Sequence, residues 1–281
     1  MLKIDGKYLS NIIMTDVELR VLRLYQIVKK YPKLAIVQVG NHGPSDTFVN
    51  LKLKAAEKVK INVEHIRLRE ESSFTQISRV IKSLNQSTDI NGIMVQLPLQ
   101  TKYPVQNLDN LLNLITANKD VDGLGMNATF IPASCLAIHH CISHALGADF
   151  TGSATIIGKG RTVGKPCATY LMKKGFCVTS ICSQNPIKEI SSDVLISAAG
   201  KPQFLKCDQI LYTKLVIDVG CSWSDKLCRW VGDVDDGSFA DRQIWISPVP
   251  GGVGPITVAM LMKNTIESAE LAINIEHTET P

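Results

Sequence analysis

Apolar residues in the first part of the chain alternate between two spacings. Residues 33–40 (KLAIVQVG) form a short run rich in Ile and Val, which is typical of a buried strand, and residues 46–60 then place apolar side chains at helical spacing. Ser45 or Asp46 is expected to cap this helix. The alternation continues and predicts a parallel sheet with helical crossovers. The predicted elements are strand 33–40, helix 46–60, strand 63–68, helix 74–84, strand 92–97 and helix 107–115.

The same alternation begins again after residue 150. A buried-strand run at 154–157 leads into a glycine-containing loop, and residues 167–174 continue as a helix. The polar segment 119–125 (KDVDGLG) lies between the two halves and is the expected boundary between domains. The pattern therefore predicts an α/β protein with two α/β domains. The remaining predicted elements are strands 177–181, 193–198, 215–219 and 244–247 and a long helix at 256–273.

Length and composition agree with two globular domains. The chain has 281 residues, 45% hydrophobic and 20% charged, which argues against a disordered or fibrous protein. The formal charge is only +4 and the two signs are interspersed, so we expect no nucleic acid among its partners. No apolar run reaches about 18 residues, so no membrane span or membrane partner is expected. Residues 1–9 lack an apolar signal region, and we expect a cytosolic protein.

Cysteine and histidine residues predict neither disulfides nor a metal site. All eight cysteines lie at Cys135 or later and none forms a CxxC pair, so we expect buried, reduced thiols. The densest metal-like cluster is His139, His140, Cys141 and His144 on a predicted helix. No carboxylate or second cysteine cluster completes a tetrahedral set of ligands, and a plain helix surface is therefore favoured over a zinc site.

The loop from Gly158 to Gly164 has the surroundings that a phosphate-binding loop needs. A strand precedes it, a helix follows it, and glycines allow backbone N–H groups to approach an anion at the helix N-terminus. The spacing is GxGxxxG, one residue longer than the common dinucleotide fingerprint. A nucleotide site and an ordinary strand-to-helix turn both fit this pattern.

The charges around this loop indicate which nucleotide it would take. Residues 181–185 (ICSQN), at the end of the next strand, contain no carboxylate that could accept a hydrogen bond from a ribose 2′-hydroxyl. Lys159 and Arg161 instead place two cations in the loop, which favours NADP over NAD. The alternative is that both are solvated loop charges.

A second candidate site combines an aromatic ring, an amine and an amide. Phe48 and Lys52 are four residues apart on a predicted helix, so they share one face, and Gln96 lies at the carboxyl end of a parallel strand. Such a group could bind a flat polar heterocycle and tune the proton of the lysine. Each residue also has an ordinary structural alternative: Phe48 in the core, Lys52 on a solvated helix face, and Gln96 as a strand-end cap.

Seven segments in order along the chain form a larger pattern. They are VQLPL at 95–99, KDVDG at 119–123, GKGRTVGKP at 158–166, GKP at 200–202, IDVG at 217–220, GDV at 232–234 and PVPGGVGP at 248–255. Together they resemble the bifunctional methylenetetrahydrofolate dehydrogenase/cyclohydrolase family, from about residue 39 to the final helix. The strings PVPGGVGP and VQLPL are highly specific, so chance agreement is not a serious alternative.

This resemblance implies a reaction and an architecture. The reaction is the NADP-dependent oxidation of 5,10-methylenetetrahydrofolate to the methenyl form, followed by hydrolysis to 10-formyltetrahydrofolate. The architecture is an N-terminal βαβ folate-binding catalytic domain, residues 1–119 joined by the last helix, 256–281, and a Rossmann-type NADP-binding domain, residues 120–255. The two domains are expected to face a cleft, and the resemblance also implies a homodimer.

The resemblance assigns roles to residues in both domains. Lys52 matches the lysine essential for hydrolysis, Gln96 the glutamine that tunes it, and Asp122 the aspartate that anchors the pterin. Phe48 stands where the family has a tyrosine that stacks on the folate, and Lys159 and Ser183 match residues that contact the 2′-phosphate. The other implied substrate-binding residues are Pro250, Gly251 and Gly252, and the implied cofactor-binding residues are Gly158, Lys159, Gly160, Arg161, Val163, Gly164, Ser183, Gly200, Gly220, Gly254 and Thr257.

Two departures from the family pattern bear on the second step. Phe48 keeps a stacking ring but lacks the tyrosine hydroxyl, and the family segment Pro-Cys-Thr-Pro-x-Gly appears here as PASCLA at 132–137. We therefore expect intact dehydrogenase chemistry and weakened cyclohydrolase chemistry. A dehydrogenase without hydrolysis and a degenerate folate- or nucleotide-binding protein are the alternatives, and the presence of Lys52, Gln96 and Asp122 together argues against degeneracy.

Overall fold

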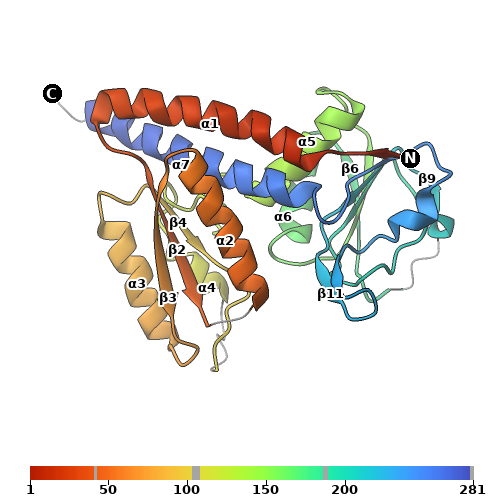
Figure 1. The fold of residues 1–281 in the computed structure, drawn as a ribbon, viewed down its shortest axis with the longest axis horizontal. Coiled ribbons are helices and arrows are strands. Elements are labelled where there is room, and N and C mark those ends of the chain that lie inside the picture. Colours follow the sequence, from red (N-terminus) through yellow and green to blue (C-terminus); the bar gives the residue numbers. More distant parts are fainter. Residues whose placement is uncertain (41–42, 103–107, 186–188, 279–281) are drawn as a thin grey trace. The chain divides into compact units, whose positions relative to one another are not determined.

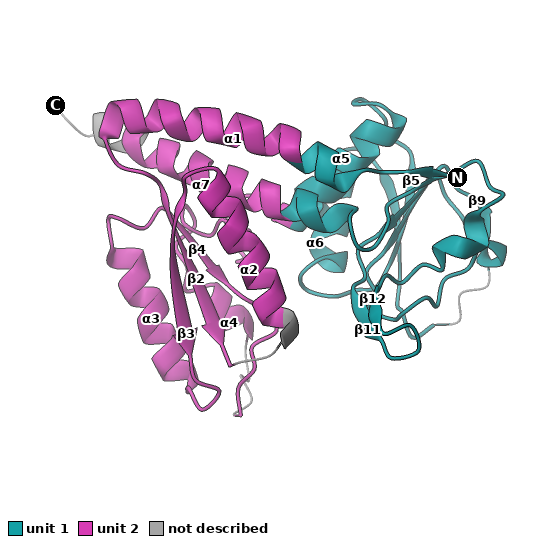
Figure 2. Cartoon of the chain, viewed as in Figure 1, with its two compact units in different colours: residues 1–10, 134–257 teal, residues 11–133, 258–281 magenta. Residues whose placement is uncertain are grey.

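The chain folds into two units, each built from two separate stretches of sequence (Figure 2). The computed structural model describes residues 1–40, 43–102, 108–185 and 189–278. Unit 1 comprises Met1–Ser10 and Ser134–Thr257, and unit 2 comprises Asn11–Ala133 and Val258–Pro281. The bounds of these units differ from the predicted division in three places. The first ten residues belong to unit 1, the main boundary follows residue 133 rather than residue 119, and unit 2 resumes at residue 258 rather than 256.

Unit 2 contains a three-stranded parallel sheet in the order β3-β2-β4 (Figure 1). Alternate side chains of the central strand point to opposite faces. Ala35, Val37 and Val39 join an apolar cluster with α3 and α4, whereas Gln38, on the other face, donates to Asp46 of α2. The predicted βαβαβ order is confirmed. Its elements are β2 (Lys33–Val39), α2 (Gly43–Lys58), β3 (Asn62–Leu68), α3 (Phe74–Gln86), β4 (Gly92–Val95) and α4 (Leu108–Leu112), residue 107 lying outside the described residues.

The start of α2 differs from the prediction. The helix begins at Gly43, so Ser45 and Asp46 lie within its first turn and do not cap it. Asp46 instead accepts hydrogen bonds from Gln38 Nε2 at 2.8 Å and from Arg67 at 2.9 Å. The acidic side chain that suggested a cap is thus engaged with the sheet, where it also complements the positive end of the helix dipole.

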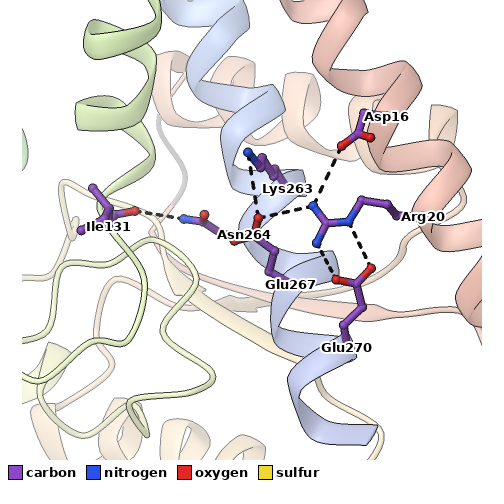
Figure 3. A network of polar contacts seen from close by, with 7 residues as sticks. All are labelled: Asp16, Arg20, Ile131, Lys263, Asn264, Glu267 and Glu270. Atoms are coloured by element: carbon purple, nitrogen blue, oxygen red, sulfur yellow. Dashed lines mark hydrogen bonds and ion pairs between the residues drawn. The ribbon is translucent and has the colours of Figure 1, made fainter. Parts of the chain in front are cut away.

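Two long helices, α1 (Gly6–Val28) and α7 (Val253–Thr278), run side by side over most of their length (Figure 1), and all but the first five residues of each belong to unit 2. Arg20 on α1 donates to Glu270 of α7 at 2.5 and 3.1 Å and to Glu267 at 3.3 Å (Figure 3). Helix α1 was not predicted, although its buried residues recur every three or four positions. The residues at this spacing are Leu9, Ile13, Val17, Val21 and Leu24, and Met14 is buried beside Ile13.

Unit 1 is built on a six-stranded parallel sheet in the order β1-β13-β10-β8-β5-β6. From β5 the chain continues to one side through β6, and then to the other side through β8, β10 and β13. The strand order therefore reverses beside β5, which is where doubly wound sheets bind nucleotides. The predicted Rossmann-type arrangement is confirmed. The strands are β1 (Leu2–Lys3), β5 (Ser153–Ile157), β6 (Cys177–Ile181), β8 (Val194–Ser197), β10 (Leu215–Asp218) and β13 (Trp245–Ile246), with helices α5 (Ala133–Leu146) and α6 (Gly164–Lys173).

Smaller elements complete unit 1. Strands β7 (Ile190–Ser191) and β9 (Ile210–Tyr212) pair in parallel, and β11 (Ser222–Ser224) forms a hairpin with β12 (Arg229–Val231). Within the described residues, no helix is both long and apolar enough to cross a bilayer. The expectation of buried thiols holds only in part, since three of the free cysteines are exposed. They are Cys177, Cys221 and Cys228.

Candidate active site

Lys52 and Gln96 meet on one face of the unit 2 sheet. Lys52 extends from α2, and Gln96 follows directly after β4, where its N–H continues the ladder to Val37 O at 2.8 Å. Lys52 Nζ donates to Gln96 Oε1 at 2.7 Å, and Gln96 Nε2 donates to the Leu97 carbonyl oxygen at 2.7 Å. Gln96 is only 6% exposed, so both ends of its amide are held in place. The amide orientation presents an oxygen to the lysine.

Asp122 completes the group from a third segment. It lies in the loop that follows the bridge between Ile93 and Asp120, so this loop is attached to the edge of β4. Buried Asp120 accepts hydrogen bonds from the backbone N–H groups of Gly123 at 3.0 Å and Gly125 at 2.6 Å. Burial raises the pKa of Asp120 to about 6. Asp122 therefore lies in a turn that is held by the hydrogen bonds to Asp120.

Helix α7 fixes the same loop from the other side. Asn264, 1% exposed, donates from Nδ2 to the carbonyl oxygens of Val121 at 2.9 Å and Ile131 at 3.0 Å (Figure 3). One turn later, Ser268 Oγ is 2.6 Å from the carbonyl oxygens of Asn91 and Asn118. Sequence reasoning missed these polar anchors and Asp120. Asn264 and Ser268 stand among other polar residues of the last helix, residues 262–270 (MKNTIESAE), so the sequence held no clear signal for them.

The electrostatics of the group favour a lysine that can exchange a proton. Loss of hydration lowers the pKa of Lys52, and the negative charge of Asp122 partly opposes this shift. Loss of hydration likewise raises the pKa of Asp122, with Lys52 opposing. Each shift brings the group closer to neutrality near physiological pH. A half-buried amine of this kind, hydrogen-bonded to an amide oxygen, is suited to general acid–base chemistry.

Phe48 lies one helical turn before Lys52 on α2. Its ring is 38% exposed, so it is not a core residue and its face is open to a ligand. The structure therefore brings Lys52, Gln96 and Asp122 together and places an accessible ring on the same face of α2. The altered segment 132–137 contains the start of α5, which begins at Ala133 and continues through the former proline and glycine positions.

The glycine loop of unit 1 approaches the neighbouring strand end closely. Gly158 follows β5 with φ +103°, and a Cβ atom there would lie 2.3 Å from the Ala198 carbonyl oxygen after β8. Any side chain would separate these two strand ends at the point where the sheet order reverses. Gly160 has open space around its Cα, and α6 begins at Gly164. The loop leaves room for an anion at the helix N-terminus.

Two buried carboxylates, Asp218 and Asp233, organise the same edge of the sheet. Asp218 accepts from the N–H groups of Gly220, Asp233 and Val234 at 2.8–3.0 Å, yet burial still raises its pKa to about 7. A Cβ atom at Gly220 would lie 2.1 Å from Asp233 Oδ1, and the equivalent atom at Gly232 would lie 2.0 Å from Asp218 Oδ2. The IDVG and GDV segments thus pair each carboxylate with a glycine that leaves room for it. Sequence reasoning noticed these segments but gave the aspartates no role.

The remaining predicted cofactor residues also follow strand ends. Ser183 lies just after β6, and Lys159 is exposed in the glycine loop. Gly200 follows β8 and Gly220 follows β10. Because all these strands are parallel, their carboxyl ends share one edge of the sheet. Arg161 and Val163 lie in the loop, at its middle and at the cap position of α6.

Residues 247–252 connect β13 to α7, and residues 253–257 begin α7. Gly251 has φ +107° and accepts a hydrogen bond from Gly6 N–H at 3.0 Å, and Gly252 N–H donates to Pro248 at 2.8 Å. Gly254 is exposed in the first turn of α7 with open space around it. Pro250 is exposed. Thr257 Oγ1 donates a hydrogen bond to the Val253 carbonyl oxygen, one turn earlier in α7, at 3.1 Å.

No cluster of potential ligands for a metal ion occurs among the described residues. The histidines considered above have separate aromatic partners: the His139 ring meets Tyr170 at 5.6 Å, and the His144 ring meets Trp245 at 5.8 Å. The candidate zinc cluster is therefore not assembled.

Two family models cover most of the chain. Residues 4–122 match the catalytic domain of tetrahydrofolate dehydrogenase/cyclohydrolase, and residues 132–273 match the NAD(P)-binding domain of the same enzyme family. The chain belongs to this family. Lys52, Gln96 and Asp122 lie within the family's catalytic domain, and the glycine loop lies within its NAD(P)-binding domain.

Relatives of known name support this assignment over the full length. The crystal structure of the bifunctional FolD methylenetetrahydrofolate dehydrogenase/cyclohydrolase from Campylobacter jejuni is similar, with TM-score 0.88 and 32% identity over 96% of this chain and 99% of that one. The Trypanosoma brucei dehydrogenase-cyclohydrolase, solved with NADP and an inhibitor, has TM-score 0.87 and 28% identity over 97% and 98%. Human cytoplasmic C-1-tetrahydrofolate synthase is 35% identical over 95% of this chain, which spans only 31% of that protein's length.

Proposed function

We propose that this protein oxidises 5,10-methylenetetrahydrofolate with NADP and then hydrolyses the methenyl product to 10-formyltetrahydrofolate. The observation that carries the proposal is the hydrogen bond of 2.7 Å from Lys52 Nζ to Gln96 Oε1, with Asp122 beside it, in the family's catalytic domain. The glycine edge of unit 1 supplies the matching coenzyme site.

Residues of unit 1 fit a bound NADP. The close approach at Gly158 and the open space at Gly160 leave backbone N–H groups accessible at the start of α6, where pyrophosphate binds in such folds. Lys159 and Ser183 would hold the 2′-phosphate, and Gly254 leaves space at the start of α7. Bound NADP would supply the acceptor for the hydride that leaves the methylene carbon. The chain then needs mainly to orient the substrate, so oxidation requires no general base.

Hydrolysis requires more of Lys52. Water adds to the methenyl carbon and must lose one proton. The resulting hydroxyl gives its remaining proton to N5 as the bond from that carbon to N5 breaks, which leaves the formyl group on N10. A neutral lysine accepts that proton, and the lowered pKa of Lys52 raises its neutral fraction. Gln96 holds the amine in position, and we assign Asp122 the role that the family resemblance implies, which is to anchor the pterin.

A second candidate function is a dehydrogenase with weak or absent hydrolysis. The exposed ring of Phe48 retains a stacking surface next to Lys52, but it carries no hydroxyl that could orient water or the amine. Oxidation needs no such hydroxyl, whereas a hydroxyl there would assist hydrolysis. We therefore expect hydrolysis to be the weaker of the two activities. A folate-binding protein without turnover is the further alternative that the experiment below distinguishes.

The test is to follow NADPH formation and methenyl decay separately in wild type and in Lys52→Met. We expect the variant to lose hydrolysis while it still binds the folate and still forms NADPH, because only hydrolysis needs a base at that position. Lys54→Met is the matched control, since Lys54 is exposed on the same helix. Folate binding with no turnover in either protein would instead establish the binding-protein alternative.

The assembly and location of the protein are also proposals. The family resemblance supports a homodimer, and light scattering during size-exclusion chromatography measures the mass directly. A cytosolic location is supported by the similarity to the human cytoplasmic C-1-tetrahydrofolate synthase.

A further inference from the structure

Lys201 places a third cation at the proposed coenzyme edge. It follows Gly200 after β8, and its Nζ donates to the Ser183 carbonyl oxygen, after β6, at 2.5 Å. Strand β5 lies between β8 and β6 in the sheet. The side chain of Lys201 therefore spans the end of β5, where the glycine loop begins, and brings its charge to the segment that lacks a carboxylate.

The backbone that carries Lys201 is fixed by a buried carboxylate. Asp233, 0% exposed, accepts from Lys201 N–H at 2.8 Å, from Ala199 N–H at 2.7 Å and from Ser197 Oγ at 2.7 Å. The ammonium group also lies 5.9 Å from the centre of the Phe204 ring. This arrangement holds a flexible side chain in one direction, which reduces the entropy lost when it binds a ligand.

The chemistry of the position fits a phosphate monoester. An ammonium group can donate three hydrogen bonds, and Lys201 uses one of them on the Ser183 carbonyl oxygen. Because Lys201 is exposed, an incoming anion can accept the others. Residues 181–185 contribute no negative charge that would repel it. In doubly wound folds this strand end faces the ribose 2′ position, where NADP carries a phosphate and NAD a hydroxyl.

We propose that Lys201 is a coenzyme-specificity residue that binds the 2′-phosphate of NADP together with Ser183 and Lys159. This inference rests on the proposed function, because it assigns one contact of the same coenzyme. It differs from the sequence-based assignment, which placed the 2′-phosphate contacts only in the glycine loop and at Ser183.

The test compares 2′,5′-ADP with 5′-ADP by isothermal titration calorimetry in wild type and Lys201→Gln. We expect the variant to bind 2′,5′-ADP about tenfold more weakly, the size of one charge-assisted hydrogen bond, and to bind 5′-ADP within about twofold of wild type. Lys201→Arg keeps the charge and should restore most of the difference. Lys206→Gln, which removes an exposed lysine of the same unit, should leave both affinities unchanged.

Kinetics with both coenzymes separate this inference from the proposed function. The variant should lose kcat/KM with NADP but not with NAD, while its thermal unfolding midpoint stays close to that of wild type. Unchanged 2′,5′-ADP affinity, or an equal loss for both nucleotides, would overturn the role of Lys201 while leaving NADP-dependent oxidation by wild type intact. If wild type bound neither nucleotide and oxidised no substrate, the proposed function would fail together with the inference.

Discussion

Lys52 depends on the chemical identity of its amide partner. A carboxylate in place of Gln96 would put a negative charge at the 2.7 Å contact with Lys52 Nζ, and the pKa of the lysine, now lowered by loss of hydration, would rise. A higher pKa leaves less neutral amine at a given pH. In Gln96→Glu we therefore expect the acid limb of the hydrolysis pH profile to move to higher pH.

The matched control for this change is Gln96→Ala. It removes the hydrogen bond without adding a charge, so the rate should fall while the limb does not move upward. The measurement is methenyl decay from pH 6 to pH 9 in all three proteins, after correction for the uncatalysed reaction. A limb that stays in place in Gln96→Glu would show that Lys52 is not the titrating base.

The missing hydroxyl at Phe48 gives a second prediction at the residue scale. Phe48→Tyr restores a group that can hydrogen-bond water or Lys52 from one turn away on α2, so we expect hydrolysis to rise by roughly tenfold, the value of one hydrogen bond. The oxidation rate should change little. Phe74→Tyr is the control, because the Phe74 ring has similar exposure, 40% against 38%, at the start of α3. If both variants hydrolyse at the wild-type rate, the hydroxyl explanation fails.

At the scale of elements, the sequence predicted those strands and helices whose apolar residues recur at a regular spacing. Strand 177–181 matches β6, and the central strands and helices of both units agree within a few residues because their apolar spacing is continuous. Helix α1 was missed because its first and last turns contain neither acidic nor basic terminal signals and several apolar side chains, such as Ile12 and Ile27, are exposed. Its buried stripe repeats regularly, and Asp5, whose carboxylate accepts a hydrogen bond from Tyr8 N–H at 2.9 Å, caps the start of the helix, a signal that sequence reasoning missed.

Polar groups that anchor loops were harder to predict than the residues they support. Lys52 and Gln96 were identified from their helix spacing and strand-end position, and the family resemblance then gave them roles and added Asp122. Asn264 lies 143 residues from Val121, whose carbonyl oxygen it binds, and no local pattern encodes such a contact. The same holds for Asp233, which holds Lys201 from 32 residues away. Long-range hydrogen bonds of this kind become visible only in the folded chain.

At the scale of the whole molecule, the two proposed activities draw on residues of different units. The base and its partners, Lys52, Gln96 and Asp122, all belong to unit 2, whereas the glycine loop and Lys159 belong to unit 1. Hydrolysis of methenyltetrahydrofolate consumes no coenzyme. A change of charge at the exposed coenzyme edge should therefore affect oxidation with NADP and spare hydrolysis, the reverse of the outcome for Lys52→Met.

Lys159→Glu tests this separation. The new carboxylate repels the 2′-phosphate, so we expect kcat/KM for NADP to fall by about tenfold or more, while hydrolysis of methenyltetrahydrofolate supplied directly stays within about twofold of wild type. Lys173→Glu makes the same charge change at the far end of α6 and should alter neither activity. Raised salt should narrow the gap between Lys159→Glu and wild type, because the repulsion is screened. If Lys159→Glu lowered both activities equally at an unchanged unfolding midpoint, hydrolysis would depend on unit 1, and the assignment of each step to its own unit would be wrong.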